Sequence, residues 1–538
     1  MSSQPLAESI LAALDADQAA ATMALRGPVC IVAGAGSGKT RTVSHRIAYG
    51  IATGVYAANR ILALTYTNRA AAELRVRLRE LGASAVQVRT FHSAALSQLQ
   101  FFWPQLTETS APKLITNKPQ LLAEVLQEHN IKLTDAQRRE VLAEIEWLKY
   151  SMTDPNEYLD LDRGLIAGLN AKVFLNLQNG YELLKQNRKV MDWEDVLLLT
   201  IGLLRSEPRM LNHVQQQFRF FTVDEYQDIS PLQQALLETW LGEREDICVV
   251  GDPRQTIYSF AGASSDFLMG FSSDHPEAEV FNLDNNYRSS LEIVTLANSV
   301  AVGRKLEAVR SAGSKPEIRA AKSAEAQISD CISGLTQALT SGMRPKQLAV
   351  LSRINSQLEP IEKGLLELGI PVQVRGAGRF FRRPEVLQVM NAIKALQLTQ
   401  SDDPLFIELS KILASMGWRS KPEVSEKWEA LNWFFEVLEE VGDDASLEEY
   451  VRELEERERS GHEPIRDAVT LATVHATKGL EWDRVHLIGM NQGLFPISHA
   501  TSESEIAEEK RLFYVAVTRA RDKLIISHNA AKPISQFL

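Results

Sequence analysis

The stretch VCIVAGAGSGKT, residues 29–40, decides the fold class of this chain. Its apolar start is typical of a buried parallel strand, and a loop of small residues follows, with a helix expected after it. Such a loop lets backbone N–H groups surround the β- and γ-phosphates of a nucleotide at the N-terminus of that helix. Lys39 then supplies a mobile positive charge, and the Thr40 hydroxyl can ligate Mg²⁺. We therefore expect a nucleotide-binding loop made of Ala33, Gly34, Ala35, Gly36, Ser37, Gly38, Lys39 and Thr40.

Length, charge and cysteine content place limits on the class of protein. A chain of 538 residues is long enough for about three or four domains. A net charge of −11 excludes a wholly basic surface but allows a local basic groove. Three scattered cysteines are too few for a four-cysteine metal site, so we expect buried, reduced thiols and a cytoplasmic protein. No apolar run approaches the ~20 residues that a membrane span needs, so no membrane partner is expected.

Strand-like and helix-like segments alternate in two parts of the chain, which predicts an α/β fold with parallel sheets. In the first part, strands are expected at 61–68, 85–93, 218–225 and 247–252. A second α/β unit is expected from about residue 280, with strands at 280–289, 348–353, 468–479, 484–490 and 523–529. Helical periodicity without a clear strand fills 94–212 and roughly 386–464. The second of these segments ends in a charged run, 446–461, which we expect to be a solvated helix face.

Polar residues that follow the predicted strands can hydrolyse a nucleotide. Asp224 and Glu225 come directly after the run FRFFTV, where one carboxylate can hold Mg²⁺ opposite Thr40 and the other can orient or deprotonate the attacking water. Gln255 follows the strand at 247–252 and can contact the γ-phosphate or its water. These residues predict a hydrolytic site with Mg²⁺ bound by Thr40 and Asp224.

Four further side chains admit two interpretations from their spacing. Tyr258 and Phe260 can stack on the bases of a single nucleic-acid strand, or they can be core aromatics. Arg288 and Arg519 can be arginine fingers that stabilise charge on the γ-phosphoryl group, or they can be ordinary surface residues. Spacing alone leaves both questions open.

The order of these segments resembles the UvrD/Rep/PcrA family of superfamily 1 DNA helicases over most of the chain. LDADQ resembles the Q motif of that family, and AGAGSGKTR, VDEYQD and NNYRSS resemble motifs I, II and IV. VHATKGLEWD and EEKRLFYVAVTRAR resemble motifs V and VI. The resemblance implies ATP and Mg²⁺ as cofactors. It also implies contacts to ATP from Gln18, Arg41, Tyr287, Arg288 and Glu481.

Other segments resemble the DNA-contacting motifs of the same family. These segments are LTYTNRAAAEL, RTFHS, MDWEDVL and GDPRQTIYSFAGA. The resemblance implies contacts to single-stranded DNA from Tyr66, Thr90, His92, Trp193, Tyr258, Phe260, His475 and Lys478.

The resemblance further implies two RecA-like lobes, each interrupted by a helical insertion. Their expected bounds are 1–93 with 213–283 for lobe 1A, 94–212 for insertion 1B, 284–385 with 465–538 for lobe 2A, and 386–464 for insertion 2B. Such a molecule would move 3′→5′ on single-stranded DNA and at single-strand/duplex junctions, in repair or replication restart, with repair or loading proteins as further partners.

Two features depart from the family pattern. Motif III usually continues with tryptophan and arginine, where this chain has Phe260 and Ala261. Insertion 2B has roughly half its usual length, which keeps open an alternative: a translocase that strips proteins from single-stranded DNA and unwinds poorly without a partner. A scaffold without motor activity and an RNA helicase are the remaining alternatives. The intact Lys39 and Asp224 argue against the scaffold, and no residue visibly rejects a 2′-hydroxyl.

Overall fold

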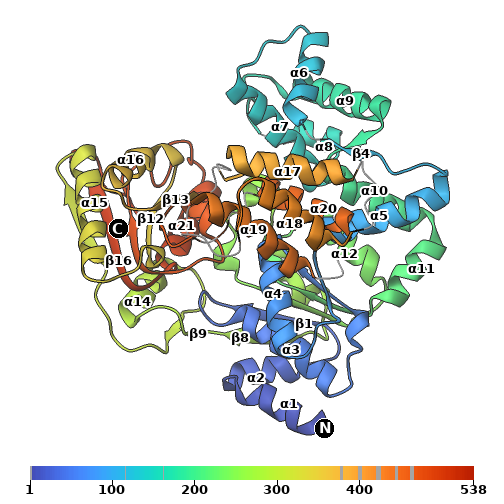
Figure 1. Cartoon of the computed structure of the whole chain (residues 1–538), viewed down its shortest axis with the longest axis horizontal. Coiled ribbons are helices and arrows are strands. Elements are labelled where there is room, and N and C mark those ends of the chain that lie inside the picture. The colour runs from blue at the N-terminus through green and yellow to red at the C-terminus, as the bar shows by residue number, and fades with distance from the viewer. Residues whose placement is uncertain are drawn as a thin grey trace. The chain divides into compact units, whose positions relative to one another are not determined.

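The computed structural model describes residues 3–115, 117–161, 163–375, 380–397, 403–419, 426–442, 446–460, 464 and 466–538. Contacts divide the chain into two compact units, which we call the first and the second unit. The first unit comprises Met1–Ala33, Lys39–Tyr66 and Arg77–Leu283. The second unit comprises Gly34–Gly38, Thr67–Val76 and Asp284–Leu538. Each unit is built around one six-stranded sheet, which confirms the predicted α/β fold class of two RecA-like lobes (Figure 1).

The first sheet has the strand order β3-β2-β6-β7-β1-β8, and all of its pairs are parallel. Its four central strands are almost entirely buried, because helices cover both faces of such a sheet. This explains why they can be recognised as apolar runs in the sequence. The strands are β1 (Val29–Ala33), β2 (Ile61–Thr65), β3 (Gln87–Thr90), β6 (Phe220–Val223), β7 (Ile247–Gly251) and β8 (Glu279–Leu283).

Strand β8 corrects one expectation. The run at 280–289 was expected to open the second sheet, but β8 pairs with β1 in the first sheet, with Val29 opposite Glu279. The residues that follow form a separate two-residue strand, β9 (Asn285–Asn286), which pairs with β10 (Glu307–Ala308). The prediction failed because an apolar run indicates a strand but carries no information about which sheet the strand joins.

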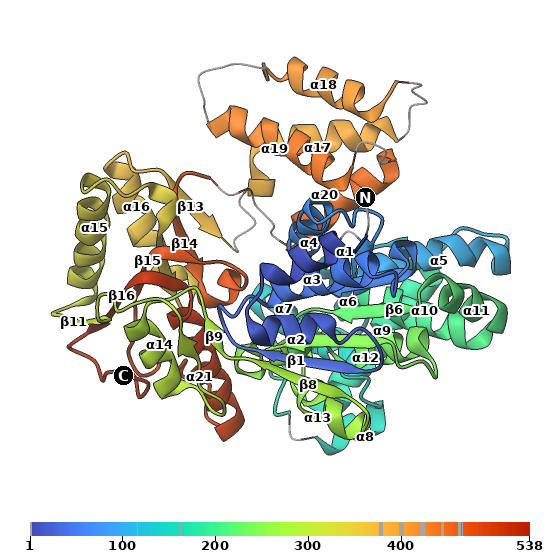
Figure 2. The ribbon, with the colours of Figure 1, turned by 90° about the horizontal axis from the view of Figure 1, so that it is seen from below.

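Helices surround the first sheet, and Figure 2 shows α2 and α3 beside β1 and β8. The capping box of Asp15 with Gln18 starts α2, and α3 begins directly after the nucleotide-binding loop. Helix α4 begins three residues after β2. The helices in this part are α1 (Ser3–Ala12), α2 (Ala16–Met23), α3 (Lys39–Ala52), α4 (Asn68–Glu80), α12 (Pro231–Leu241) and α13 (Asp266–Asp274).

The segment between β3 and β6 is mainly helical, as its periodicity predicts. It also contains one short parallel pair, β4 (Lys113–Leu114) with β5 (Val190–Met191), which is too short to leave a pattern in the sequence. The helices are α5 (Phe91–Thr107), α6 (Lys118–Glu128), α7 (Asp135–Tyr150), α8 (Pro155–Asp160), α9 (Ala171–Arg188), α10 (Trp193–Ser206) and α11 (Pro208–Gln217).

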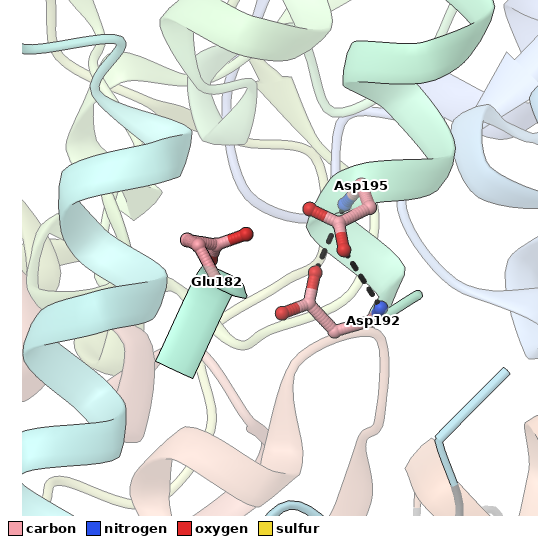
Figure 3. Close-up of side chains that lie close together, drawn as sticks. All are labelled: Glu182, Asp192 and Asp195. Atoms are coloured by element: carbon pink, nitrogen blue, oxygen red, sulfur yellow. Dashed lines mark hydrogen bonds between the residues drawn. The ribbon is translucent and has the colours of Figure 1, made fainter. Parts of the chain in front are cut away.

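A buried charge cluster joins three of these helices. Glu182 lies on α9, Asp192 is the N-cap of α10 and Asp195 is in its first turn (Figure 3). Their carboxylates are the one group among the described residues that is spaced for a metal ion. However, Lys149 and Lys185 each pair with all three carboxylates at 2.5–2.9 Å. Two ammonium groups therefore already supply the positive charge that a cation would bring, and we interpret the cluster as an ion-pair network.

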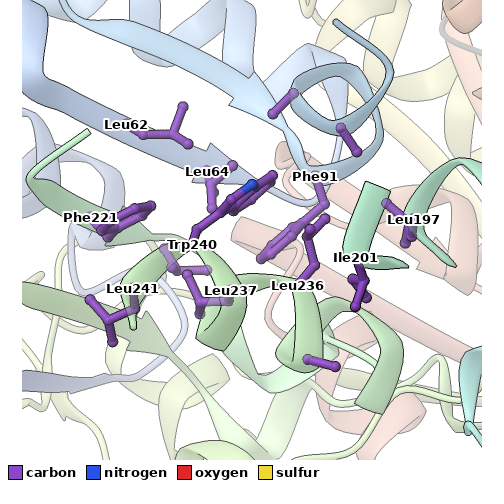
Figure 4. Close-up of a cluster of buried hydrophobic side chains, with 14 of the residues drawn as sticks. Leu62, Leu64, Phe91, Leu197, Ile201, Phe221, Leu236, Leu237, Trp240 and Leu241 are labelled. Carbon is purple, nitrogen blue, oxygen red and sulfur yellow. The ribbon is translucent and has the colours of Figure 1, made fainter. Parts of the chain in front are cut away.

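The main core of the first unit lies between the sheet and the helices α5, α10 and α12 (Figure 4). Trp240 is fully buried in this core, and its ring stacks on Phe91 with centroids 6.1 Å apart. The indole N–H of Trp240 donates to Gln98 Oε1 at 2.8 Å, so the polar atom of the ring is satisfied. This packing fixes α5 and α10, which carry the predicted DNA-contacting residues of RTFHS and MDWEDVL.

The second sheet has the order β11-β16-β15-β12-β14-β13, and its pairs are also parallel. Figure 2 shows α15 and α16 on one side of it and α14 and α21 on the other. The strands are β11 (Glu317–Ala321), β12 (Leu348–Ser352), β13 (Val372–Arg375), β14 (Val469–Thr473), β15 (Trp482–Leu487) and β16 (Ala520–Asn529). The helices are α14 (Leu291–Val300), α15 (Ala324–Thr340), α16 (Glu359–Glu367) and α21 (Glu503–Val517).

Four helices between β13 and β14 pack on one another around a core of their own. The charged run at 446–461 forms most of the last helix, whose face is not wholly solvated: Tyr450, Leu454 and Arg457 are buried, and Arg457 pairs with Glu440 and Glu453. The helices are α17 (Pro384–Leu396), α18 (Leu405–Ser415), α19 (Glu426–Val441) and α20 (Leu447–Ser460).

Two simpler expectations can be compared with the structure. Cys30 and Cys248 are buried free thiols, as their apolar runs predict, and Cys331 is a buried free thiol as well. Over the described ranges, no helix combines the length and the apolarity that crossing a membrane requires. The bounds proposed for 1A, 1B, 2A and 2B remain predictions.

Candidate functional site

The nucleotide-binding loop leaves β1 at Ala33 and enters α3 at Lys39. Gly36 and Gly38 have φ of +69° and +82°, a conformation that disfavours side chains with a Cβ. The Ser37 hydroxyl donates to the carbonyl of Gly34 at 2.8 Å and closes the turn. The first N–H groups of α3 have no partners within the helix, so loop and helix together provide backbone donors suited to phosphate. Lys39 and Thr40 are half-buried at the start of that helix.

Asn286 fixes this loop, and sequence reasoning did not identify it. Its side chain is fully buried, and its Nδ2 donates to the carbonyl of Ala35 at 2.6 Å. Its Oδ1 accepts the N–H groups of Arg288 and Ser289. A Cβ added at Gly36 would lie 2.7 Å from Asn286 Nδ2 and would clash with it. This clash is a second reason, besides the positive φ, why position 36 requires glycine. Asn286 therefore couples the shape of the loop to the backbone that carries Arg288.

The two predicted carboxylates follow β6. Asp224 is 4% exposed, and its Oδ1 accepts the N–H of Glu225 at 2.9 Å. Glu225 has φ of +55°, in the left-handed region that non-glycine residues rarely adopt. Such backbone conformations cluster at functional sites, where they direct a side chain that an ordinary conformation would not.

Gln227 links the carboxylates to the neighbouring strand end, and sequence reasoning did not identify it. Its Nε2 donates to Glu225 Oε2 at 2.6 Å and to Asp228 Oδ2 at 3.0 Å. Its Oε1 accepts the N–H of Asp252 at 3.0 Å, and Asp252 Oδ2 accepts Nε2 of Gln255 at 2.9 Å. Glu225 and Gln255 are therefore joined by a buried chain of hydrogen bonds.

Two side chains predicted to contact the nucleotide, Gln18 and Arg41, form hydrogen bonds with backbone groups near the N-terminus. Gln18 is buried, and its Oε1 accepts the N–H of Asp15 at 3.3 Å within the capping box. Arg41 is exposed and donates to the carbonyl of Ala13 at 2.5 Å. Both side chains therefore lie in the first unit and contact the loop between α1 and α2. Gln18 belongs to α2, and Arg41 belongs to α3.

Arg288 and Glu481 form an ion pair in the second unit. Arg288 Nη1 also donates to the carbonyl of Thr518 at 3.2 Å, and Arg521 approaches Glu481 at 3.1 Å. Burial opposes ionisation of Glu481, but the guanidinium groups of Arg288 and Arg521 outweigh it and lower its pKa. Glu481 is therefore held as a carboxylate beside Arg288. Tyr287, the residue before that arginine, is 40% exposed, and its N–H donates to the carbonyl of Gly36 at 2.9 Å.

Arg519 is 2% exposed and lies where α21 leads into β16. Its guanidinium donates to the carbonyls of Val515 and Leu480 at 3.0 and 3.1 Å, and to the hydroxyl of Thr518 at 3.2 Å. Burial with these acceptors excludes the interpretation of Arg519 as an ordinary surface residue.

A first group of aromatic side chains lies at the ends of β2 and β7. Tyr66 and Tyr258 stack with ring centroids 5.3 Å apart and an interplanar angle of 16°. Phe260 packs edge-on against Tyr258 at 6.1 Å and is 63% exposed. Tyr66 and Tyr258 are half-buried, so these rings form a partly open aromatic surface and not a closed core.

A second aromatic group lies at the start of α5. His92 contacts Trp193 edge-on at 5.9 Å, so the segments RTFHS and MDWEDVL meet in space. Thr90 is the buried N-cap of α5, and its Oγ1 accepts the N–H of Ser93 at 3.2 Å. Tyr150 is a third member that sequence reasoning missed: its hydroxyl lies 3.1 Å from His92 Nε2.

His475 and Lys478 lie in and just after a 3-10 turn that follows β14, and both are half-buried. Burial, with help from the nearby Arg353, lowers the pKa of His475 to about 4. The imidazole is therefore neutral at physiological pH, so it offers a hydrogen bond and not a charge to a nucleic-acid backbone.

The three missed residues share one property: they act through contacts with distant parts of the chain. Asn286 and Gln227 belong to NNYRSS and VDEYQD, and an amide side chain after a strand was the available signal. Tyr150 ends the helical run RREVLAEIEWLKY, where nothing in the local pattern separates it from a core aromatic.

Family models and relatives agree with this arrangement. The UvrD/REP helicase N-terminal domain matches residues 14–276, and the UvrD-like helicase C-terminal domain matches 281–420 and 397–531. The chain is 38% identical to ATP-dependent DNA helicase UvrD2 of Mycobacterium tuberculosis, over 97% of this chain and 79% of that protein. It is 28% identical to ATP-dependent DNA helicase PcrA of Leuconostoc citreum, over 97% and 82% of the two chains, and 27% identical to that of Bacillus subtilis, over 97% and 84%. The chain therefore belongs to the UvrD/REP helicase family and is an enzyme of the ATP-hydrolysing helicase class.

Proposed function

We propose that this enzyme uses ATP hydrolysis to move 3′→5′ along single-stranded DNA and to unwind duplexes that carry a 3′ tail. The proposal rests on two features of the first unit. The residues assigned to hydrolysis follow β1, β6 and β7, and the aromatic groups lie after β2 and β7 and at the start of α5. Motor action needs both, because hydrolysis has to be linked to a change in the grip on DNA. Strand β7 leads into both sets, since Gln255 and Tyr258 follow it within seven residues.

We assign the chemistry of ATP hydrolysis as follows. Lys39 neutralises charge on the β- and γ-phosphates, and Glu225 orients and deprotonates the attacking water. Thr40 and Asp224 would hold Mg²⁺, and the fit is good because a hydroxyl and a buried carboxylate are the hard oxygen ligands that this ion prefers. Mg²⁺ would neutralise charge on the phosphates. Gln255 would sense the γ-phosphate, and Arg288 and Arg519 would stabilise its charge as it is transferred.

The remaining residues would bind the nucleotide base and sugar and the DNA. Gln18, Arg41 and Tyr287 would contact adenine, and Glu481 the ribose. The DNA strand would be held by stacking and by phosphate contacts without sequence preference. The residues in this role are Tyr66, Thr90, His92, Trp193, Tyr258, Phe260, His475 and Lys478.

We further propose a place in DNA repair or replication restart in the cytoplasm, with repair or loading proteins as partners. The support for this cellular role is the DNA substrate, because repair and replication restart both require duplex DNA to be opened.

Unwinding assays on matched duplexes with a 3′ or a 5′ tail test the polarity. We expect ATP-dependent unwinding from the 3′ tail and none from the 5′ tail; unwinding from the 5′ tail alone would contradict the proposal. Lys39→Ala serves as the matched control, because it removes the phosphate-binding charge while the loop backbone is retained. We expect that variant to lose hydrolysis and unwinding while its thermal midpoint stays close to that of the native chain.

The second candidate is a translocase that strips proteins from single-stranded DNA and unwinds poorly alone. The small four-helix core between β13 and β14 favours it, because a small insertion offers little surface to a duplex. Hydrolysis stimulated by single-stranded DNA, without unwinding from either tail, would select this candidate.

A further inference from the structure

Tyr150 lies between His92 and the turn that carries Phe260 in the first unit. Its ring lies edge-on to His92 with centroids 6.1 Å apart, and His92 lies edge-on to Trp193. On its other side, a Cβ added at Gly262 would lie 3.0 Å from the Cβ of Tyr150. Gly262 comes two residues after Phe260, so Tyr150 connects the group at the start of α5 with the turn that carries Phe260.

The exposure of Tyr150 suits a ligand-facing ring and not a core ring. Tyr150 is half-buried at the last residue of α7, where one part of its ring packs against the main core. Its hydroxyl contacts His92 and fixes the ring orientation. An amphipathic ring that is anchored at its polar end and only half-buried is suited to stacking on a nucleobase.

The ion-pair network includes the residue that precedes Tyr150 in the chain and the residue that precedes Trp193. Lys149, the neighbour of Tyr150, contacts Asp192 Oδ2 at 2.9 Å, and Asp192 precedes Trp193. Burial alone would favour neutral Lys149 and neutral Asp192. The neighbouring carboxylates nevertheless raise the pKa of Lys149, and the neighbouring lysines lower the pKa of Asp192. The pair is therefore ionised, and it ties the last turn of α7 to the first turn of α10.

We propose that Tyr150 contacts single-stranded DNA by stacking on a nucleobase beside His92 and Trp193, and that the Lys149–Asp192 pair positions it. This inference rests on the proposed function, because it requires a DNA strand on this face of the first unit. It adds one base-contacting residue that the sequence motifs do not contain. Tyr150 is the DNA-contacting residue, and Lys149 and Asp192 are positioning residues.

Equilibrium binding of a fluorescently labelled oligo-dT at fixed salt tests the contact. Loss of one base stack costs about 1–3 kcal/mol, so we expect Tyr150→Ala to raise Kd by about 5- to 160-fold. Tyr150→Phe retains the ring, and we expect its Kd to stay within about threefold of the native value. If Tyr150→Ala does not fold, Tyr150→Leu carries the same expectation, because it retains apolar volume without an aromatic face.

Trp147→Ala is the matched control on the same helix. Trp147 stacks under Arg163 at 3.6 Å and packs against the core around Tyr158, whereas Tyr150 packs against the main core. We therefore expect the removal of Trp147 to leave the oligo-dT affinity unchanged. If the native chain fails to bind oligo-dT, the proposed function fails and this inference falls with it. If the native chain binds and Tyr150→Ala binds within twofold of it, the inference alone is overturned.

A double-mutant cycle tests the positioning role. Asp192→Asn keeps a good N-cap for α10 but removes the charge that pairs with Lys149. We expect Asp192→Asn to weaken oligo-dT binding several-fold in the native background and to have little further effect in the Tyr150→Ala background. Equal losses in both backgrounds would show that Asp192 acts on the fold or on Trp193 and not through Tyr150.

Discussion

At the residue scale, Gln227 connects the two chemical groups of the hydrolytic site. It is fully buried, and its one amide group makes three hydrogen bonds: two donated to the carboxylates of Glu225 and Asp228, and one accepted from the Asp252 backbone. Gly251 is required beside it, because a Cβ there would lie 2.5 Å from Gln227 Oε1. The position of Glu225 therefore depends on a side chain that touches no reacting atom.

We predict that Gln227→Ala slows ATP hydrolysis by about 10- to 100-fold, because small displacements of a catalytic group have costs of this size. Nucleotide affinity should remain within about threefold, since the phosphate-binding loop makes no contact through Gln227. Single-turnover hydrolysis and titration with a fluorescent ATP analogue measure the two quantities separately. A variant that hydrolyses ATP within twofold of the native rate would show that the position of Glu225 does not depend on Gln227.

At the element scale, the sequence predicts the central strands of the second sheet well and its two edge strands poorly. Central strands such as β12 (Leu348–Ser352) are fully buried and therefore appear as continuous apolar runs. The edge strands β11 (Glu317–Ala321) and β13 (Val372–Arg375) have one open side. Residues of β11 alternate between half-buried and exposed up to Ala321, those of β13 alternate between half-buried and buried, and neither strand was predicted. The same limit applies to the site: residues that directly follow central strands could be predicted, whereas Asn286, Gln227 and Tyr150 depend on contacts between distant segments.

Strand β15 (Trp482–Leu487) carries a buried histidine that should make stability depend on pH. Burial, together with Arg484 and Arg319, lowers the pKa of His486 to about 3, against an ordinary value of 6.5. Arg484 Nε donates to His486 Nε2 at 3.2 Å, so protonation would remove this acceptor and place two cations together. Because the unfolded chain takes up the proton near pH 6.5 and the folded chain does not, the free energy of unfolding falls as pH drops below 6.5.

For this one histidine, we expect a loss of about 2 kcal/mol between pH 7.5 and pH 5. His486→Gln removes the titration but keeps an acceptor for Arg484. Urea unfolding of the native chain and of this variant, each at several pH values between 7.5 and 5, measures the difference. We expect the native chain to lose more stability on acidification than the variant does, and parallel profiles would contradict the prediction.

At the scale of the whole molecule, the segment that holds the four helices between β13 and β14 begins and ends near Gln373 of the second sheet. Gln373 on β13 donates to the carbonyl of Pro464 at 2.5 Å and accepts the N–H of Arg466 at 3.3 Å. The chain therefore returns beside the strand that it left. The helices pack around Trp433, Phe434 and Leu409 in their own core, while β13 and β14 belong to the core of the sheet. The helices and the sheet therefore have separate hydrophobic cores.

We therefore predict that residues 380–463 can be replaced by about ten Gly and Ser residues without loss of the motor. A flexible linker of this length spans about 18 Å, which suffices for two chain ends that already meet at Gln373. Hydrolysis stimulated by oligo-dT should remain within about threefold of the native rate, because every residue assigned to ATP or DNA lies outside the replaced segment. A folded variant with a tenfold loss of stimulated hydrolysis would place part of the motor in these helices. Unwinding of a 3′-tailed duplex by the same variant, divided by its hydrolysis rate, then measures what the insertion contributes to duplex opening alone.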